Sequence, residues 1–361
     1  RKKITFSCWF KLGALGATGT LFSCDDTGSD KEFMFWVQSD ATIRIANYEG
    51  GTNALNLITN DLFRDPTAWY HLVFQADTDT VSNASTIKLW INGVQVTDFS
   101  TETYPSADFE FALGNSFDHE IGRYALSNNN LWNGYIAEMV FLDGSSHPAS
   151  DFGGWDSNGI WMPKDPTAQG FTFGTNGFLI QFEGDGGTFD SNADAGGVGA
   201  DTSGVGNHFA GNGNVHNNRT TDTPTNTSGD NEGNFATWSP VDKDSNVTLS
   251  EGNKTAEQDS SSAWKSVFAT QAIPVTGKWI WETKLHGTDP FGGWLAVGVA
   301  SHDVLTSAAR SATGTILFDY RDDGVNDLRI FNQTASEADQ ASNITFNNGF
   351  CIYFVVKLFL K

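Results

Sequence analysis

Residues 4–12 read Ile-Thr-Phe-Ser-Cys-Trp-Phe-Lys-Leu, and this stretch decides the fold class. The even positions are all apolar, whereas the odd positions hold Thr, Ser, Trp and Lys. A period of two with one apolar face is typical of a strand in a sheet that is packed on one side. We therefore expect a half-buried strand at the start of the chain.

Similar short stretches follow along the chain, separated by residues that form turns. Asn92-Gly93 between Ile91 and Val94 predicts a tight hairpin, because both central residues of a type I′ turn need positive φ. No long segment has the three-to-four spacing of a helix. Further predicted strands of the first half are residues 33–38, 42–46, 70–76, 86–91, 94–99, 120–123 and 135–142. The pattern predicts an all-β fold of antiparallel sheets stacked face to face, in a jelly-roll or concanavalin-like arrangement.

Composition sets the size of the fold and limits its partners. The 361 residues suffice for two domains, and 28 Phe and 12 Trp can fill two cores. Asp and Glu number 43 against 21 Lys and Arg, a formal net charge of −22. Such a chain repels phosphates, so we expect no nucleic acid partner. The charge either keeps the protein soluble or holds calcium through some of the carboxylates.

The ends of the chain and its cysteines carry further expectations. The sequence begins without Met, and we expect it to start inside a longer or processed polypeptide. The apolar stretch 351–360 is too short for a spanning helix and contains Lys357, so we expect no membrane insertion. Three cysteines give no disulfide framework, and Cys8 and Cys24 are expected to be buried free thiols.

Four sequence segments of the first half, in this order, resemble those of a known family. They lie at residues 4–11, 63–73, 87–94 and 133–141. Together they resemble a laminin-G-like, concanavalin-type lectin sandwich over roughly residues 4–165. The resemblance implies a fold that usually binds glycans or proteins and seldom catalyses, although fold alone does not establish function.

The rest of the chain predicts a connector and a second sandwich. From about residue 183 to 233 the sequence is rich in Gly, Asn, Asp, Ser and Thr, and we assign residues 1–235 to the first domain. Within the connector, residues 201–207 resemble an Asp-x-Ser-Gly-x-Gly-Asn turn found beside laminin-G-like strands. Residues 236–361 form the second predicted domain. Its strands at residues 264–270, 278–285, 294–300 and 314–320 resemble a SPRY sandwich, which we expect to be incomplete at its C-terminal end, completed by another chain, or altered there.

The order of the two sandwiches resembles structural proteins of marine bacteriophages. That resemblance implies a non-enzymatic virion surface protein, a fibre, appendage or decoration module, with other virion proteins or copies of itself as partners and host-surface glycans as ligands. It implies a place on the virion surface or outside the cell. The alternatives are a secreted or cell-surface adhesin or lectin of a cellular organism, and a polysaccharide-degrading enzyme on a concanavalin scaffold.

The sequence lacks the residue patterns of a glycosidase, a zinc enzyme or a serine hydrolase, and this argues against the enzyme alternative. A retaining glycosidase on this scaffold needs two carboxylates about 5–5.5 Å apart, which a strand supplies as Glu-x-Asp-x-Glu. The nearest sequence is Asp108-Phe109-Glu110, which lacks the third acid. The seven His are scattered without zinc-ligand spacing, and there is no Gly-x-Ser-x-Gly or phosphate-binding loop.

Two groups of residues remain as candidate sites. Trp132, within an Asn-rich stretch, and nearby Tyr124 are candidates for packing against a sugar, or they seal the rim of the sandwich. Calcium is the only cofactor that we expect, since it takes carboxylate, amide and carbonyl oxygens from loops. Its candidate ligands are Asp25, Asp26, Asp201 and Asn207, although Asp and Asn also form ordinary turns.

Overall fold

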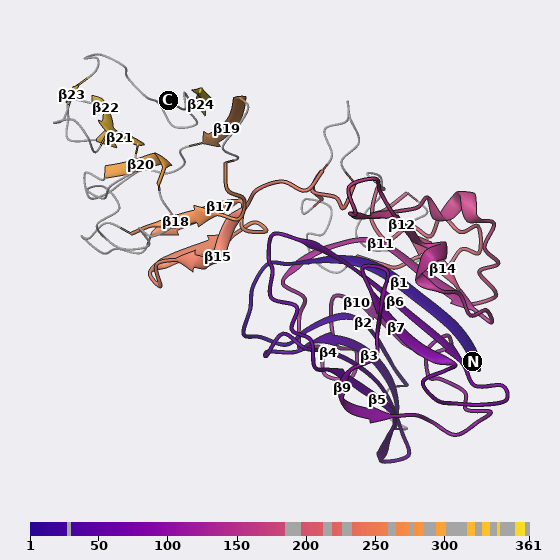
Figure 1. The fold of residues 1–361 in the computed structure, drawn as a ribbon. Coiled ribbons are helices and arrows are strands. Elements are labelled where there is room, and N and C mark those ends of the chain that lie inside the picture. The colour runs from indigo at the N-terminus through magenta and orange to yellow at the C-terminus, as the bar shows by residue number, and fades with distance from the viewer. Residues whose placement is uncertain are drawn as a thin grey trace. The chain divides into compact units, whose positions relative to one another are not determined.

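The computed structural model describes residues 1–26, 30–184, 196–211, 219–225, 233–258, 265–273, 278–284, 294–300, 316–321, 327–332, 338–339 and 351–357. These residues form strands, loops and two short 3-10 helices, so the predicted all-β fold is confirmed (Figure 1). The chain divides into two compact units. The first comprises Arg1–Val241 with Glu251–Asn253, and the second comprises Asp242–Ser250 with Lys254–Lys361.

The first unit is a sandwich of two antiparallel six-stranded sheets. One sheet has the order β14 (Phe178–Ile180), β11 (Gly134–Asp143), β1 (Lys3–Leu12), β6 (Trp69–Asp77), β7 (Ile87–Ile91) and β8 (Val94–Val96). The other has the order β10 (Asp118–Ile121), β2 (Gly19–Asp25), β3 (Lys31–Val37), β4 (Ile43–Glu49), β5 (Thr52–Thr59) and β9 (Phe99–Thr103). The two sheets are labelled in Figure 1.

A core of aromatic side chains joins the inner faces of the two sheets. Phe6 of β1 stacks on Phe35 of β3 with ring centroids 4.2 Å apart, and Phe33 lies 5.9 Å from Phe74 of β6. All five even positions of β1 are buried in this core, as their alternation predicts. Cys8 and Cys24 are free thiols buried in the same core, on strands of opposite sheets. Packing of this kind makes the pair of sheets one sandwich.

The outward face of β1 is also buried, which the alternation did not indicate. Thr5, Ser7, Trp9 and Lys11 are all at most 2% exposed. The segment after β11 covers part of this face with η1 (Ala149–Asp151), β12 (Gly153–Trp155), β13 (Trp161–Pro163) and η2 (Pro166–Gln169). The prediction of a sheet packed on one side was wrong here, because a covering layer from later in the chain provides a second apolar core.

Lys11 shows how a still later segment reaches this face. Its Nζ lies 2.8 Å from Asp222 Oδ2 and donates to Asn234 Oδ1 and the carbonyl oxygen of Phe235. Asp222 Oδ1 accepts from Trp69 Nε1 at 2.9 Å. These bonds place the described residues of 219–237 on the sandwich. The parts of the predicted connector at 185–195, 212–218 and 226–232 lie outside the described residues.

The Asn92-Gly93 hairpin is confirmed, and the strand after it is shorter than expected. Asn92 has φ 49° and Gly93 has φ 75°, as a type I′ turn requires. A Cβ on Gly93 would lie 2.4 Å from the Trp161 ring, so the covering layer also needs glycine there. The single strand predicted over 94–99 is instead β8 in one sheet and the start of β9 in the other, because the chain crosses between sheets at residues 97–98.

The second unit consists of several small antiparallel pairings. β20 (Trp294–Val299), β21 (Ile316–Arg321), β22 (Asp327–Asn332) and β23 (Ala338–Asp339) form a four-stranded sheet. Two two-stranded sheets are β19 (Lys278–Lys284) with β24 (Cys351–Lys357), and β16 (Val247–Ser250) with β17 (Thr255–Gln258). β18 (Val267–Ala269) is a further strand of this unit, whereas β15 (Trp238–Lys243) belongs mostly to the first unit. The SPRY likeness, the boundary at 235/236 and the incomplete end remain predictions.

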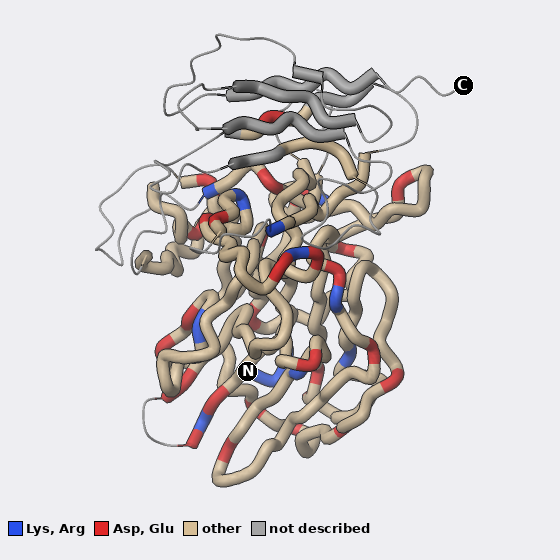
Figure 2. Tube along the Cα trace, turned by 90° about the vertical axis from the view of Figure 1, so that its left-hand side faces the viewer, with Lys and Arg blue, Asp and Glu red and all other residues tan. Residues whose placement is uncertain are grey.

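Charge is spread over the first unit. Acidic residues occur along its loops and strands and outnumber the basic ones (Figure 2). No helix among the described residues is long and apolar enough to span a membrane.

Candidate functional site

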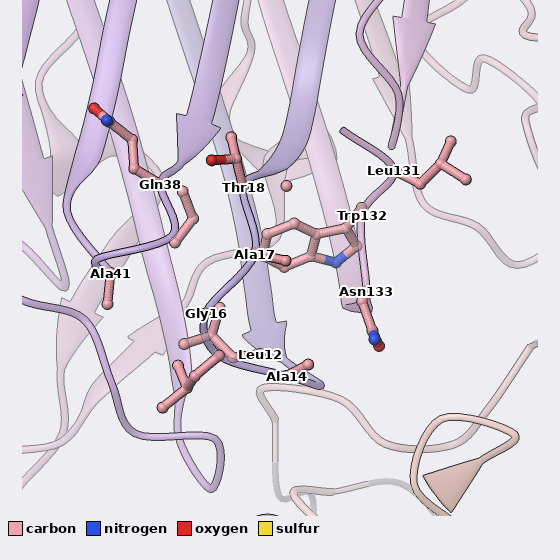
Figure 3. A pocket seen from close by; sticks show the side chains of 13 residues that line it. Leu12, Ala14, Gly16, Ala17, Thr18, Gln38, Ala41, Leu131, Trp132 and Asn133 are labelled. Carbon is pink, nitrogen blue, oxygen red and sulfur yellow. The ribbon is translucent and has the colours of Figure 1, made fainter. Parts of the chain in front are cut away.

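A recess lies at the end of the sandwich where β1 and β3 finish and β2 and β4 begin. Its cavity volume is about 50 Å³, so the recess is shallow. Its walls come from the loop between β1 and β2, the turn between β3 and β4, and the residues before β11 (Figure 3). The lining residues are Leu12, Ala14, Leu15, Gly16, Ala17, Thr18, Gly19, Val37, Gln38, Ala41, Leu131, Trp132 and Asn133.

The indole of Trp132 is held firmly in this recess. Its Nε1 donates to the Tyr135 carbonyl oxygen at 3.3 Å, and its backbone N–H donates to Gly122 O at 2.7 Å. The ring meets Phe10 edge to face, with centroids 5.7 Å apart. It also packs against Gly19, where a Cβ would lie 2.9 Å from the ring. The ring is therefore half-buried and fixed, and Figure 3 shows it beside Ala17 in the recess.

Small and apolar side chains surround the ring, with a few polar groups among them. Leu131, next to Trp132, is 64% exposed. Gln38 donates its backbone N–H to Thr42 O at 2.8 Å, and its side-chain Oε1 is buried with no donor among the described residues. Thr18 and Asn133 add a hydroxyl and an amide to the wall. An aromatic ring with a few polar groups around it is the usual composition of a small-ligand site.

Tyr124 lies elsewhere, and the structure does not bring it together with Trp132 in the recess. Its ring meets Trp36 edge to face at 5.0 Å, and its hydroxyl donates to Glu32 Oε2. Burial and the hydrogen bond with Glu32 raise the pKa of Tyr124. Both ends of this tyrosine are thus engaged over the outward face of β3. Its predicted role in glycan binding remains a prediction.

Sequence reasoning missed most of the recess. Residues 13–19 read Gly-Ala-Leu-Gly-Ala-Thr-Gly, a run of mostly small residues between two strands. That run predicts a close-packed loop that leaves room beside a large ring, and it was a usable signal. Gln38 and Ala41 had no such signal, because their place in the recess depends on pairing between β3 and β4.

Asp25 and Asp26, two of the calcium candidates, lie at the end of β2. Asp25 is 4% exposed and pairs in register with Glu32 on one side and Asp118 on the other. Burial raises the pKa of Glu32, and repulsion from Asp25 and Asp26 adds to this effect. No group of three or more His, Cys, Asp or Glu placed to hold a metal occurs in the described part of the chain, which omits residues 27–29 beside Asp26. Calcium there stays a prediction.

Asp201 and Asn207, the other two candidates, form a hydrogen-bonded turn. Asp201 accepts from the backbone N–H groups of Leu179, Ser203, Gly206 and Asn207 at 2.9–3.0 Å. The Asn207 side-chain N–H donates to Thr175 O and Gly177 O. Burial opposes ionisation of Asp201, but these backbone bonds lower its pKa below the usual value. The turn fastens residues 196–209 to β14, and calcium binding by these side chains stays a prediction.

Ser7 and His71 lie as close together as a nucleophile and its general base, but the imidazole is protonated on the nitrogen that would have to accept the serine proton. Ser7 Oγ is 2.8 Å from His71 Nε2, and Trp161 Nε1 donates to His71 Nδ1 at 2.9 Å. The imidazole therefore carries its proton on Nε2 and donates it to Ser7, so it cannot accept the serine proton. Burial lowers the pKa of His71 to about 3. The pair is a structural contact beneath the covering layer.

Residues 1–149 match a laminin G family model described as the concanavalin A-like lectin/glucanases superfamily. The first sandwich therefore has a concanavalin-like β-sandwich fold. The match includes Tyr124 and every residue that lines the recess. No curated protein sequence matches the chain.

Several solved structures are similar at low identity. A SAP-like pentraxin from Limulus polyphemus has 15% identity and TM-score 0.25, with coverage of 40% of this chain and 65% of that one. The CBM40 of a Ruminococcus gnavus sialidase has 14% identity and TM-score 0.29, with coverage of 37% and 72%. Domains LG4-5 of mouse laminin alpha1 have 16% identity and TM-score 0.28, with coverage of 39% and 35%. At these values the three structures add nothing to an assignment of function.

Proposed function

We propose that the first unit is a non-enzymatic carbohydrate-binding module and that the recess around Trp132 is its binding site. The observation that carries this proposal is the fixed, half-buried indole at the open end of a lectin sandwich. A sugar presents C–H groups on one face of its ring and hydroxyls at its edge. We expect the indole to support the former, and the Thr18 hydroxyl and the Asn133 amide, which also line the recess, to bond the latter.

The wider role that we propose is that of a virion surface protein, a fibre, appendage or decoration module that recognises host-surface glycans. Support for this setting is the sequence resemblance of the two successive sandwiches to phage structural proteins. The setting has its own test. Mass spectrometry of purified phage particles should detect the chain. Its absence from those particles would favour a cell-surface adhesin.

A glycan array and a host-cell binding assay test the site itself. We expect the purified full chain to bind, and we expect Ala17→Arg to abolish binding, because Ala17 is exposed at the recess and an arginine there fills it. Trp132→Ala should weaken binding at least about tenfold. Ala107→Arg, on an exposed turn outside the recess, is the matched control and should bind like the wild type.

The same assay with calcium and then with a chelator tests the cofactor prediction. Loss of binding on chelation would assign a calcium-dependent lectin. Binding that survives chelation but is lost in Ala17→Arg supports the recess alone. Binding that Ala17→Arg and Trp132→Ala leave intact would show that the recess is not the site.

A further inference from the structure

Arg44 lies on the outward face of the sheet that contains β2–β5, and no described residue provides it with a carboxylate partner. It is half-buried on β4, where it pairs in register with Trp36 of β3 and Ile58 of β5. Its Nε donates to Asn56 Oδ1 at 2.9 Å and its Nη2 to Asn53 Oδ1 at 3.4 Å. Both partners are neutral amides. The remaining N–H groups, on Nη1 and Nη2, have no acceptor among the described residues.

Six other basic side chains of the first unit are paired with acids in its described part, whereas Arg64, Lys88, Lys164 and Arg219 are not. The ion pairs in its described part are Arg1 with Asp143, Lys2 with Asp108, Lys3 with Asp77 and Asp79, Lys11 with Asp222, Lys31 with Glu49, and Arg123 with Glu120. In a chain with 43 acidic residues, a carboxylate is easily supplied to a cation that needs one. Arg64 and Arg219, the other arginines of the described part of this unit without a carboxylate, are exposed to water, whereas Arg44 is half-buried.

The surroundings of Arg44 hold its guanidinium in place without neutralising it. Burial lowers the pKa of Arg44, and the Tyr124 phenol partly opposes this. An arginine nevertheless stays charged at any physiological pH, so the cost of removing it from water is not relieved by deprotonation. The two amides hold one edge of the fork, and the outer edge is left for an acidic group that presents two oxygens, such as a carboxylate or a sulfate, and can accept in a bidentate manner.

Aromatic rings lie beside this fork. The guanidinium carbon is 5.4 Å from the Trp36 ring centroid, and Tyr124 meets the far side of Trp36 at 5.0 Å. The Trp36 Nε1–H is buried without an acceptor among the described residues, so donors outnumber acceptors at this place. Trp36 also directly precedes Val37 and Gln38, which line the recess. Trp36 thus adjoins the recess along β3, with its side chain on the outward face of the sheet.

We propose that Arg44, flanked by Trp36, binds the acidic group of an anionic saccharide. This inference rests on the proposed carbohydrate-binding function and names the class of sugar, one that carries a carboxylate or a sulfate. The net charge of −22 repels dense polyanions. We therefore expect a saccharide that carries a single acidic group and is otherwise neutral.

Calorimetric titration of the full chain tests the proposal, in about 0.15 M salt where the Debye length is about 8 Å. The carboxylate probe is a galacto-oligosaccharide that carries one galacturonic acid residue, and its methyl ester is the neutral partner. The sulfate probe is a galacto-oligosaccharide that carries one sulfate, with its desulfated form as partner. We expect one acidic probe to bind at least about tenfold more tightly than its neutral partner, as a bidentate arginine contact provides. The preferred pair identifies the acidic group.

Two substitutions locate the effect. Arg44→Gln should remove the preference for the acidic probe, and Arg44→Lys should keep only part of it, because lysine retains the charge without the fork. Arg64→Gln removes the same charge from an exposed position and should leave the preference unchanged. Circular dichroism and thermal unfolding of each variant show whether it is folded.

The outcomes separate this proposal from the function on which it rests. Equal affinity for acidic and neutral probes, or an unchanged preference in Arg44→Gln, overturns the role of Arg44. If binding is nevertheless lost in Ala17→Arg, the carbohydrate-binding recess stands. If no saccharide probe or array glycan binds the wild type, both proposals fall.

Discussion

Glu138 is an acidic residue in an environment that disfavours its charged form. It occupies a bulge in β11, between Ala137, which pairs with Trp9, and Met139, which pairs with Cys8. Its φ is 43°, a left-handed value that is strained for a glutamate. The described residues supply no hydrogen bond to its carboxylate. Burial raises the pKa of Glu138 to about 8, and repulsion from Asp165 and Glu183 adds to it.

This pKa gives stability a specific pH dependence. The folded state keeps the Glu138 proton up to about pH 8, whereas the unfolded state releases it near the ordinary value of 4.5. The unfolded state binds fewer protons in that interval, so this group makes the free energy of unfolding fall as pH rises from 4.5 to 8. Glu138→Gln has no such proton to lose. We expect it to be more stable than the wild type by about 1–3 kcal/mol at pH 8.5 and nearly equal near pH 4.5.

Urea denaturation at both pH values measures this difference. Glu110→Gln, at an exposed position of the same unit, is the control and should change little at either pH. A wild type whose stability does not fall relative to Glu138→Gln between the two pH values would contradict the assignment.

At the scale of elements, the alternation of apolar and polar residues in single strands predicted which side chains face the inside of the sandwich. It did not predict how the outward faces are covered. The even positions of β1 form the core as expected, since a period of two fixes which side chains share a face. The burial of its odd positions depends on residues 144–176, 219–225 and 233–237, which no local pattern connects to β1. β5 was absent from the predicted strands, because its exposed face is rich in Asn, a residue more common in turns.

The candidate site shows the same division between local and distant causes. Trp132 was selected as a large ring among polar residues, which is a local signal. The partners of Tyr124, namely Glu32 and Trp36, lie on β3, about ninety residues earlier in the chain, and that contact follows from tertiary packing. Arg44 had no sequence signal, because an arginine in a strand is ordinary until its neighbours are known.

The turn at Asp201 is an element whose stability can be predicted. Asp201→Ala removes the acceptor for four backbone N–H groups, including that of Leu179 in β14. We expect a loss of about 2–4 kcal/mol, and faster hydrogen exchange at residues 178–180, because buried donors lose their partner. Asp156→Ala is the matched control, since Asp156 also accepts from backbone N–H groups but in an exposed turn. It should cost less than about 1 kcal/mol.

Unfolding in the presence of a chelator tests whether calcium also holds this turn. If the turn is held by hydrogen bonds alone, a chelator should leave the unfolding of the wild type unchanged. If chelation destabilises the wild type and not Asp201→Ala, then the carboxylate holds a metal as well, which would correct the hydrogen-bonded account of the turn.

At the scale of the whole molecule, the first sandwich is completed by chain that is distant in sequence. The segment that includes Asp222 returns to the outward face of β1 and β6, where Lys11 and Trp69 are its polar contacts. A buried ion pair of this kind contributes little net stability. It does make the position of the returning segment specific, because either charge alone would be buried without a partner. The exact place of the boundary between the domains thus depends on this contact.

Lys11→Met tests whether the returning segment is docked in solution. The substitution leaves the Asp222 carboxylate, 3% exposed, without its counter-ion, and we expect the first unit to lose about 3–5 kcal/mol in urea denaturation followed by tryptophan fluorescence. Adding Asp222→Leu should restore much of the loss, since an apolar pair of similar volume removes the buried charge. Lys3→Met, which breaks an exposed pair with Asp77 and Asp79, should cost below about 1 kcal/mol. If Lys11→Met costs no more than Lys3→Met, the segment is not held against β1, and the first domain ends before it.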